Sequence, residues 1–132
     1  MPGSFYVVAI IDDDDLIREA LRALLSAFDC KVELYDSGEA FRAAAATTRA
    51  NCLMIDVHLG TASGLELGRR LAQAGMRWPV IYMSATCGEP MRQRAHEAGG
   101  IAFLCKPFVA EELRRALDAA RRRGPRGPAG SD

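Results

Sequence analysis

The sequence predicts an α/β fold, a (βα)5 arrangement with one doubly wound, five-stranded parallel sheet. Short apolar runs of strand length alternate with longer segments whose apolar residues recur at helical spacing. The second run alternates polar and apolar residues as an edge strand does, which predicts the strand order 2-1-3-4-5. We expect strands at 5–11, 31–35, 52–56, 79–84 and 101–105, and helices at about 15–28, 38–47, 65–75, 91–98 and 110–122.

The first half of the chain supports two strand–helix units. Residues 5–11 are almost continuously apolar and rich in Val and Ile, which is typical of a parallel strand buried on both faces. The helix over 15–28 follows from apolar residues at helical spacing, and Asp14 or Asp15 is its expected N-cap. After the edge strand, Ser37 offers an N-cap for a second helix that a run of alanines favours.

The second half repeats the unit three times. The third strand ends at Asp56, and a loop through Ser63 and Gly64 leads into the third helix. The fourth helix is looser and more polar than the others. The last helix carries a single apolar face, formed by Leu113, Ala116, Leu117 and Ala120.

Length and composition limit the range of functions. The chain has 132 residues, and we expect one domain over 1–122 followed by a disordered tail or linker remnant, rich in Gly and Pro, over 123–132. Lys and Arg balance Asp and Glu at 17 each, so there is no bulk attraction to nucleic acid or to an anionic membrane. Arginines near the end suit the last turn of a helix, a reading that we prefer to nucleic-acid contact. No signal peptide or spanning segment is visible, and we expect a cytoplasmic protein.

The cysteines give no strong signal. Cys30, Cys52, Cys87 and Cys105 show no CxxC spacing, which argues against a zinc site or a thioredoxin-like redox site. Cys52 and Cys105 lie in apolar strand-like runs, where cysteine is expected to pack as a small hydrophobic residue. Cys87 lies in a predicted loop, and the sequence does not define its reactivity.

Three of the predicted strands end at charged residues, and the positions of these residues predict a binding site. Asp12 and Asp13 follow the first strand, Asp56 ends the third and Lys106 follows the fifth. Ligands of open α/β sheets bind outside the carboxyl ends of the strands, at the switch in strand order. Two carboxylates about 4 Å apart repel by about 4 kcal/mol at an effective dielectric near 20. The cluster therefore calls for a cation, and oxygen ligands shared with a phosphate suit Mg²⁺.

The remaining polar groups fit the same crevice. Lys106 is placed to hold a phosphoryl oxygen, and Ser84, ending the fourth strand, adds a hydroxyl donor. Because His58 follows Asp56 by two residues, we expect its backbone carbonyl to face the ion and its side chain to point elsewhere. Because the two histidines are scattered, a transition metal is disfavoured, and His96 is expected on the surface. Pro107 makes a cis bond to Lys106 plausible.

Five segments in order resemble the receiver domains of response regulators in two-component signalling, with a CheY-like fold, and the pattern is most similar to FixJ-type transcription regulators. The resemblance extends over about residues 5–122. Its motifs are Ile11-Asp12-Asp13, Met54-Ile55-Asp56-Val57, Ser63-Gly64-Leu65-Glu66-Leu67, Met83-Ser84-Ala85 and Phe103-Leu104-Cys105-Lys106-Pro107-Phe108, with the segment from Pro90 to Gly99 as the FixJ-type feature.

The resemblance implies a role for each matching residue. Asp56 would be the phosphoacceptor, Asp13 a direct Mg²⁺ ligand and Asp12 a ligand acting largely through water. Ser84 and Lys106 would bind the phosphoryl oxygens. The protein would not be an ordinary enzyme, but a phosphoacceptor that assists its own phosphorylation and dephosphorylation. The donor would be a sensor histidine kinase or a phosphotransfer protein.

The resemblance also implies a switch. Phe103 would turn inward when Ser84 moves toward the phosphoryl group, altering the face formed by the fourth helix, fifth strand and fifth helix. That face would support a phosphorylation-enhanced homodimer, with Met91 as the one obvious apolar candidate. DNA would be contacted only through an output domain that this chain lacks.

The sequence departs from the family at the loop after the acceptor. Gly60 stands where many receivers have proline, so we expect a more mobile loop. His58 and Thr86 occupy the positions that tune attack of water in the family, and Ala85 leaves access to Asp56 open. We therefore expect a modest phosphoryl lifetime.

Two alternatives remain open from the residues. A haloacid-dehalogenase-like phosphatase also uses an aspartate nucleophile and Mg²⁺, but it requires a second aspartate where this chain has His58. A phosphorylation-independent protein-binding module on the same scaffold is the other alternative. It leaves unexplained why the complete set of acidic, hydroxyl and lysine side chains is present.

Overall fold

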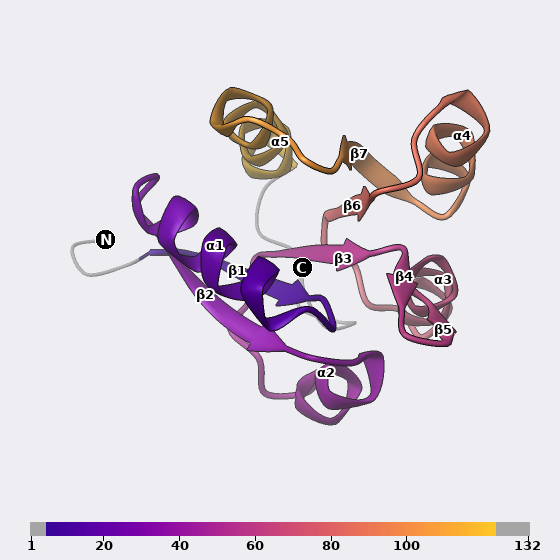
Figure 1. Ribbon diagram of the computed structural model, residues 1–132. Helices are drawn as coiled ribbons and strands as arrows, with labels where there is room; N and C mark the ends of the chain where they lie inside the picture. Colours follow the sequence, from indigo (N-terminus) through magenta and orange to yellow (C-terminus); the bar gives the residue numbers. More distant parts are fainter. Residues whose placement is uncertain (1–4, 124–132) are drawn as a thin grey trace.

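A computed structural model describes residues 5–123 of the chain. A five-stranded parallel sheet runs through its centre in the order β2-β1-β3-β6-β7 (Figure 1). This is the predicted 2-1-3-4-5 order, because β4 and β5 form a separate two-stranded hairpin. The strands are β1 (Tyr6–Ile11), β2 (Cys30–Tyr35), β3 (Cys52–Asp56), β4 (His58–Leu59), β5 (Ala62–Ser63), β6 (Val80–Ser84) and β7 (Gly100–Cys105). The helices are α1 (Asp15–Ser26), α2 (Gly38–Ala44), α3 (Gly64–Gln73), α4 (Glu89–Glu97) and α5 (Ala110–Arg122).

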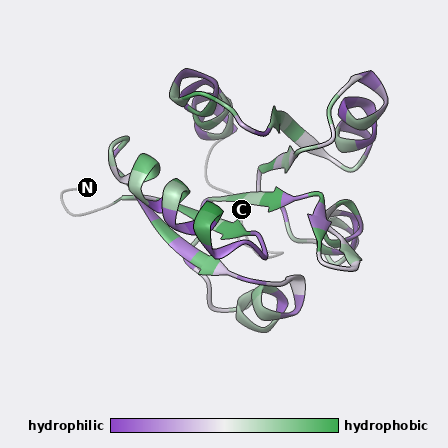
Figure 2. Cartoon of the chain, viewed as in Figure 1, coloured by the Kyte–Doolittle hydropathy of each residue, from purple (hydrophilic) through white to green (hydrophobic). Residues whose placement is uncertain are grey.

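The helices cover both faces of the sheet. Helices α1 and α5 lie on one face, and α2, α3 and α4 lie on the other (Figure 1). Successive residues of β1 point to opposite faces, with Val8 and Ile10 in one core and Ala9 and Ile11 in the other. The central strands are accordingly largely hydrophobic, whereas the helices carry both hydrophobic and hydrophilic residues (Figure 2). This confirms the doubly wound fold.

The helix starts follow the predicted capping chemistry. The side chain of Asp14 accepts from the backbone N–H groups of Leu16 at 2.9 Å and Ile17 at 3.4 Å. The Ser37 hydroxyl caps α2 by accepting from the N–H of Ala40 at 3.0 Å. Helix α2 ends at Ala44, three residues before the predicted end at 47, and a turn completes the segment.

Two expectations about local structure were wrong. The segment after Asp56, predicted as a loop, contains a short antiparallel hairpin of β4 and β5, with Gly60 at its turn at φ +64°. Met91 lies in the core with 6% exposure, because Met91, Ala95 and Ala98 form the inward face of α4 and its C-cap. Met91 is therefore unavailable as an apolar dimer contact.

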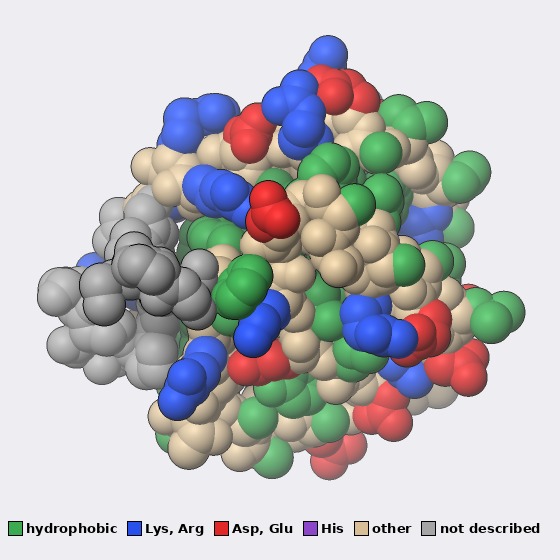
Figure 3. Space-filling view, turned by 90° about the vertical axis from the view of Figure 1, so that its left-hand side faces the viewer, with side chains coloured by type: hydrophobic (Ala, Val, Ile, Leu, Met, Phe, Trp, Pro, Cys, Tyr) green, Lys and Arg blue, Asp and Glu red, His purple; other side chains and the backbone are tan. Residues whose placement is uncertain are grey.

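The surface in view in Figure 3 carries Lys, Arg, Asp and Glu side chains side by side, in keeping with the neutral net charge. Among the described residues, no helix is long and apolar enough to cross a membrane. The predicted disordered tail, apart from Arg123, lies outside the described residues.

Candidate functional site

The carboxyl ends of four strands of the sheet bring the predicted site residues together. Asp12 follows β1, Asp56 ends β3, Ser84 ends β6 and Lys106 follows β7. Backbone hydrogen bonds continue the sheet at these ends, from Asp12 N–H to the carbonyl of Tyr35 at 3.1 Å and from Lys106 N–H to that of Ser84 at 2.8 Å. The register of the sheet therefore positions the polar side chains.

Three carboxylates form one cluster. Asp12, Asp13 and Asp56 each offer an oxygen, and these atoms lie within 4.8 Å of one another. Asp12 is fully buried and Asp56 is 7% exposed, whereas Asp13 is exposed. Gly60 lies beside Asp13, because a Cβ at Gly60 would stand 3.7 Å from its Oδ2 atom. The β4–β5 hairpin thus forms one wall of the cluster.

Lys106 connects the two buried carboxylates. Its Nζ atom donates to Oδ2 of Asp12 at 2.8 Å and to Oδ2 of Asp56 at 3.0 Å, and its side chain is 16% exposed. The sequence predicted Lys106 in the crevice but not this double ion pair. A fixed cation between two acids offsets part of their repulsion.

The titration of the pair reflects its burial. Burial raises the pKa of Asp12 above its ordinary value, although hydrogen bonds from Lys106 and from the N–H of Asp14 act in the opposite direction. Burial also lowers the pKa of Lys106, but its hydrogen bonds to Asp12 and Asp56 outweigh this effect and raise the pKa overall. Lys106 is therefore held in its charged form.

Both oxygens of the Asp56 carboxylate have a defined partner. Oδ2 accepts from Lys106, and Oδ1 accepts from the backbone N–H of His58 at 3.0 Å. Gly64 packs against the carbonyl of Asp56 so closely that a Cβ would lie 1.9 Å from that oxygen. The glycine in the sequence motif is thus required for close approach of α3 to β3. The side chain of His58 is exposed.

Ser84 and Phe103 occupy the predicted switch positions. Ser84 is fully buried, and its Oγ accepts from the backbone N–H of Thr86 at 2.9 Å. Phe103 is partly buried against the core, and the guanidinium of Arg92 lies 5.3 Å from its ring centroid. This cation–π contact, which adds to the packing of the ring, was not predicted from the sequence. His96 is exposed on α4, as predicted.

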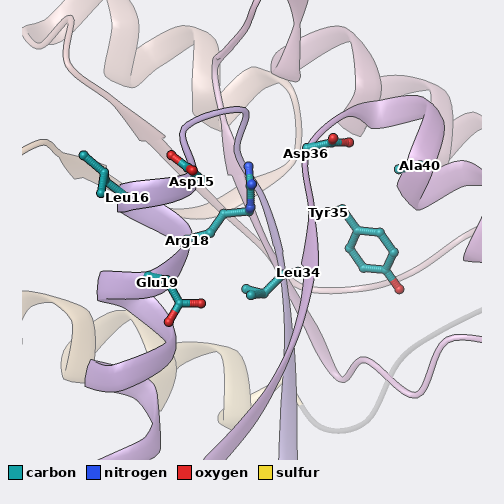
Figure 4. Close-up of a pocket in the computed structure, with 8 residues that line it drawn as sticks. All are labelled: Asp15, Leu16, Arg18, Glu19, Leu34, Tyr35, Asp36 and Ala40. Atoms are coloured by element: carbon teal, nitrogen blue, oxygen red, sulfur yellow. The ribbon is translucent and has the colours of Figure 1, made fainter.

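A separate hollow borders the cluster between α1, the edge strand β2 and α2 (Figure 4). Asp15, Leu16, Arg18 and Asp36 are among its lining residues, but Asp12, Asp13 and Asp56 are not. Arg18 links the hollow to the site, because its Nη1 atom donates to the carbonyl of Asp12 at 2.6 Å. This contact, one turn into α1, was also missed from the sequence.

The donor set suits a divalent cation. Three carboxylates against one lysine leave a formal charge of −2 in the cluster. Oxygen-only donors of this kind are the ligands of hard cations. The residues present therefore fit a metal ion, with exposed Asp13 as the carboxylate nearest solvent.

The family model of the response regulator receiver domain matches residues 8–118. The chain belongs to this family. It is 35% identical over 119 residues to the response regulator protein TmoT of Ectopseudomonas mendocina, covering 90% of this chain and 54% of that protein. It is 32% identical over 115 residues to the transcriptional regulatory protein FixJ of Rhizobium meliloti, covering 87% of this chain and 56% of FixJ.

Solved structures agree with this assignment. The crystal structure of FixJ-N superposes with a TM-score of 0.82 and 31% identity, covering 90% of this receiver and 95% of that chain. A receiver protein from Pseudoalteromonas atlantica gives a TM-score of 0.80 at 27% identity, with coverage of 89% and 98%. This receiver spans about half the length of the curated relatives that it matches. These findings support a receiver domain of two-component response regulators, and they favour neither alternative.

One cysteine assignment was wrong. Cys52 is fully buried as predicted, but Cys105 forms a disulfide with Cys87 and does not pack as an isolated small hydrophobic residue. The cysteine spacing did not predict this disulfide, because the two cysteines are 18 residues apart and the β6–β7 pairing brings them together.

Proposed function

We propose that this receiver accepts a phosphoryl group on Asp56 from a phosphohistidine of a sensor histidine kinase or phosphotransfer protein. The observation that supports this most directly is the double ion pair of Lys106, which holds a charged donor beside the carboxylate of Asp56 and beside buried Asp12. In the transfer, the P–N bond of the phosphohistidine breaks and a P–O bond forms to a carboxylate oxygen of Asp56. An aspartate is a competent nucleophile for this step.

The residues around Asp56 would then rearrange by small distances. Lys106 lies 3.0 Å from Oδ2 and is placed to contact an oxygen of the attached group. The backbone N–H of His58 holds Oδ1 and fixes the orientation of the carboxylate. Mg²⁺, bound through Asp13, Asp56 and the His58 carbonyl, with Asp12 acting largely through water, would offset negative charge on the phosphoryl oxygens. In this way the receiver would assist its own phosphorylation and dephosphorylation.

The switch would start at Ser84. Its hydroxyl now accepts from the N–H of Thr86, and turning toward the phosphoryl group breaks that hydrogen bond. The space that Ser84 leaves would admit Phe103, whose ring must also leave the guanidinium of Arg92. His58, whose N–H donates to Asp56, and Thr86, whose N–H donates to Ser84, are both exposed, consistent with a role in setting access of water and thus a modest phosphoryl lifetime.

The output is proposed from the relatives. FixJ is named a transcriptional regulatory protein and is about twice as long as the matched region, so we propose that this receiver controls an output domain acting on DNA. A homodimer would use the face of α4, β7 and α5. Because Met91 is buried, contacts there would rest on exposed residues such as Val109, which is 62% exposed, and on the charged side chains of α5.

Incubation with acetyl phosphate and Mg²⁺ tests the proposal. The intact mass should increase by one phosphoryl group in the native protein and should not change in Asp56→Asn. The matched control is Asp36→Asn, which changes an exposed aspartate immediately after β2 and should be labelled normally. Absence of an adduct on the native protein, or an equal adduct on Asp56→Asn, would overturn the assignment.

A further inference from the structure

The disulfide lies across the proposed switch. Cys87 follows Ser84 by three residues in the loop between β6 and α4, and Cys105 is the last residue of β7, next to Lys106. Their Cα atoms are 5.7 Å apart, within the usual range for a disulfide. Ser84 and Cys105 are direct partners in the β6–β7 register. The bond therefore ties the Ser84 loop to the strand that carries Lys106.

Few other contacts restrain this loop. Residues 85–88 are exposed, and Gly88, at φ +113°, is the N-cap of α4 and provides no side-chain capping hydrogen bond. The N–H of Thr86 donates to Ser84 Oγ, the hydrogen bond that must break when Ser84 turns. The covalent link through Cys87 is thus the strongest restraint on the segment that has to move.

The two bonded cysteines are accessible, and the other two are protected. Cys87 is exposed and Cys105 is partly exposed, so a thiol reagent can reach the bond. Cys30 is 6% exposed and Cys52 is fully buried. Burial raises the pKa of the Cys52 thiol to about 12, which keeps it in its unreactive protonated form. Redox chemistry is therefore directed to one pair.

We propose that Cys87 and Cys105 form a reversible dithiol–disulfide site that gates the phosphorylation switch. The site rests on the proposed function, because it acts on the same Ser84 loop. In the oxidising direction, the two thiols lose two protons and two electrons as their S–S bond forms, and a small disulfide such as oxidised glutathione is cleaved to two thiols. A dithiol reductant reverses the reaction by thiol–disulfide exchange.

The disulfide form favours the unphosphorylated arrangement. The disulfide holds the loop in the position in which the N–H of Thr86 donates to Ser84 Oγ. The phosphorylated arrangement therefore requires either distortion of the disulfide or its reduction. Coupling between two sites is reciprocal for equilibrium binding. Binding of beryllium trifluoride, a stable phosphoryl analogue, should therefore make the disulfide easier to reduce, and reduction should strengthen that binding.

A thiol count tests the chemistry independently of phosphorylation. After incubation with oxidised glutathione and its removal, the denatured native protein should show two free thiols, and after dithiothreitol it should show four. Peptide mapping should find the link between Cys87 and Cys105. Four free thiols in both samples would overturn the redox site while leaving the receiver function intact.

The coupling is tested by comparing the two forms with Mg²⁺ present. Reduced protein should bind beryllium trifluoride at least about fivefold more tightly than oxidised protein, the lower end of usual coupling between sites. Cys87→Ser, a change at an exposed loop position, should match the reduced protein and should not respond to glutathione. Equal affinity in both forms would overturn the gate. Absence of binding in both forms, together with no acetyl phosphate labelling, would instead count against the proposed function.

Discussion

Replacing Lys106 with methionine should destabilise the metal-free receiver by about 3–5 kcal/mol at neutral pH, the usual cost of removing one partner of a buried ion pair. The substitution keeps the aliphatic stem but removes the charge between Asp12 and Asp56. Two buried or nearly buried carboxylates then face each other without a fixed cation. The fold should survive, because methionine fills most of the space of the lysine stem.

The magnitude follows from the two distances. At an effective dielectric near 20, the pairs at 2.8 and 3.0 Å are each worth about 5–6 kcal/mol, or about 11 kcal/mol together. Removal of water from the lysine, which is 16% exposed, offsets more than half of this attraction, about 6–8 kcal/mol. The remainder, lost in the variant, lies in the range of about 3–5 kcal/mol.

The deficit should depend on pH in a defined direction. The folded-state pKa of Asp12 is already raised by burial, and loss of the lysine hydrogen bond, which lowers that pKa, raises it further. A raised folded-state pKa contributes stability below the unfolded pKa, near 3.8, that is lost as pH rises through the folded value. The variant should therefore be closest to the native protein in mild acid and furthest from it at neutral pH.

Urea unfolding with and without Mg²⁺ measures these effects. Millimolar Mg²⁺ should recover part of the loss in Lys106→Met, because a bound cation takes over the role of the lysine charge. Lys31→Met is the matched control, since Lys31 is exposed and its Nζ atom lies 4.6 Å from the centroid of the Phe5 ring, away from the acidic cluster. A variant as stable as the native protein without metal, or a deficit insensitive to both pH and Mg²⁺, would refute the electrostatic argument.

Two further substitutions test the site and its support. Asp13→Asn should raise the metal-free melting temperature, because a charge within 4.8 Å of its neighbours contributes about 1 kcal/mol of repulsion or more, even at the dielectric of bulk water. The substitution should also remove the stabilisation by Mg²⁺, and a lower melting temperature would show a structural role instead. Gly68→Ala should cost about 2–4 kcal/mol in urea unfolding, because its Cβ would lie 1.8 Å from the hydroxyl of Tyr82 and displace a buried hydrogen bond. Gly38→Ala, whose Cβ meets only ordinary contacts, is the control, and equal loss in both variants would contradict the steric argument.

The sequence was sufficient to predict the fold and the place of the site. Alternating strands and helices defined the sheet order, and the strand ends then had to bring Asp12, Asp56, Ser84 and Lys106 to one edge. This inference needs only the geometry of parallel sheets, so it does not depend on side-chain detail.

What the sequence left out depends on pairwise contacts between distant residues. Lys106 reaches two carboxylates 94 and 50 residues away, and a strand-end argument places it nearby without defining its hydrogen bonds. Cys87 meets Cys105 because a loop folds across the end of β7. Met91 is different, since the spacing of Met91, Ala95 and Ala98 already marked an inward helix face that the polar composition of α4 obscured.

The central claim is that Asp56, and no other acid of the cluster, carries the phosphoryl group. Borohydride reduces an aspartyl phosphate to homoserine, so the position of the label can be located by peptide sequencing in a mass spectrometer after treatment with acetyl phosphate and Mg²⁺. We expect homoserine at position 56 alone, and none when Mg²⁺ is removed by a chelator. Homoserine at Asp12 or Asp13, or a phosphorylated protein without homoserine at position 56, would contradict it.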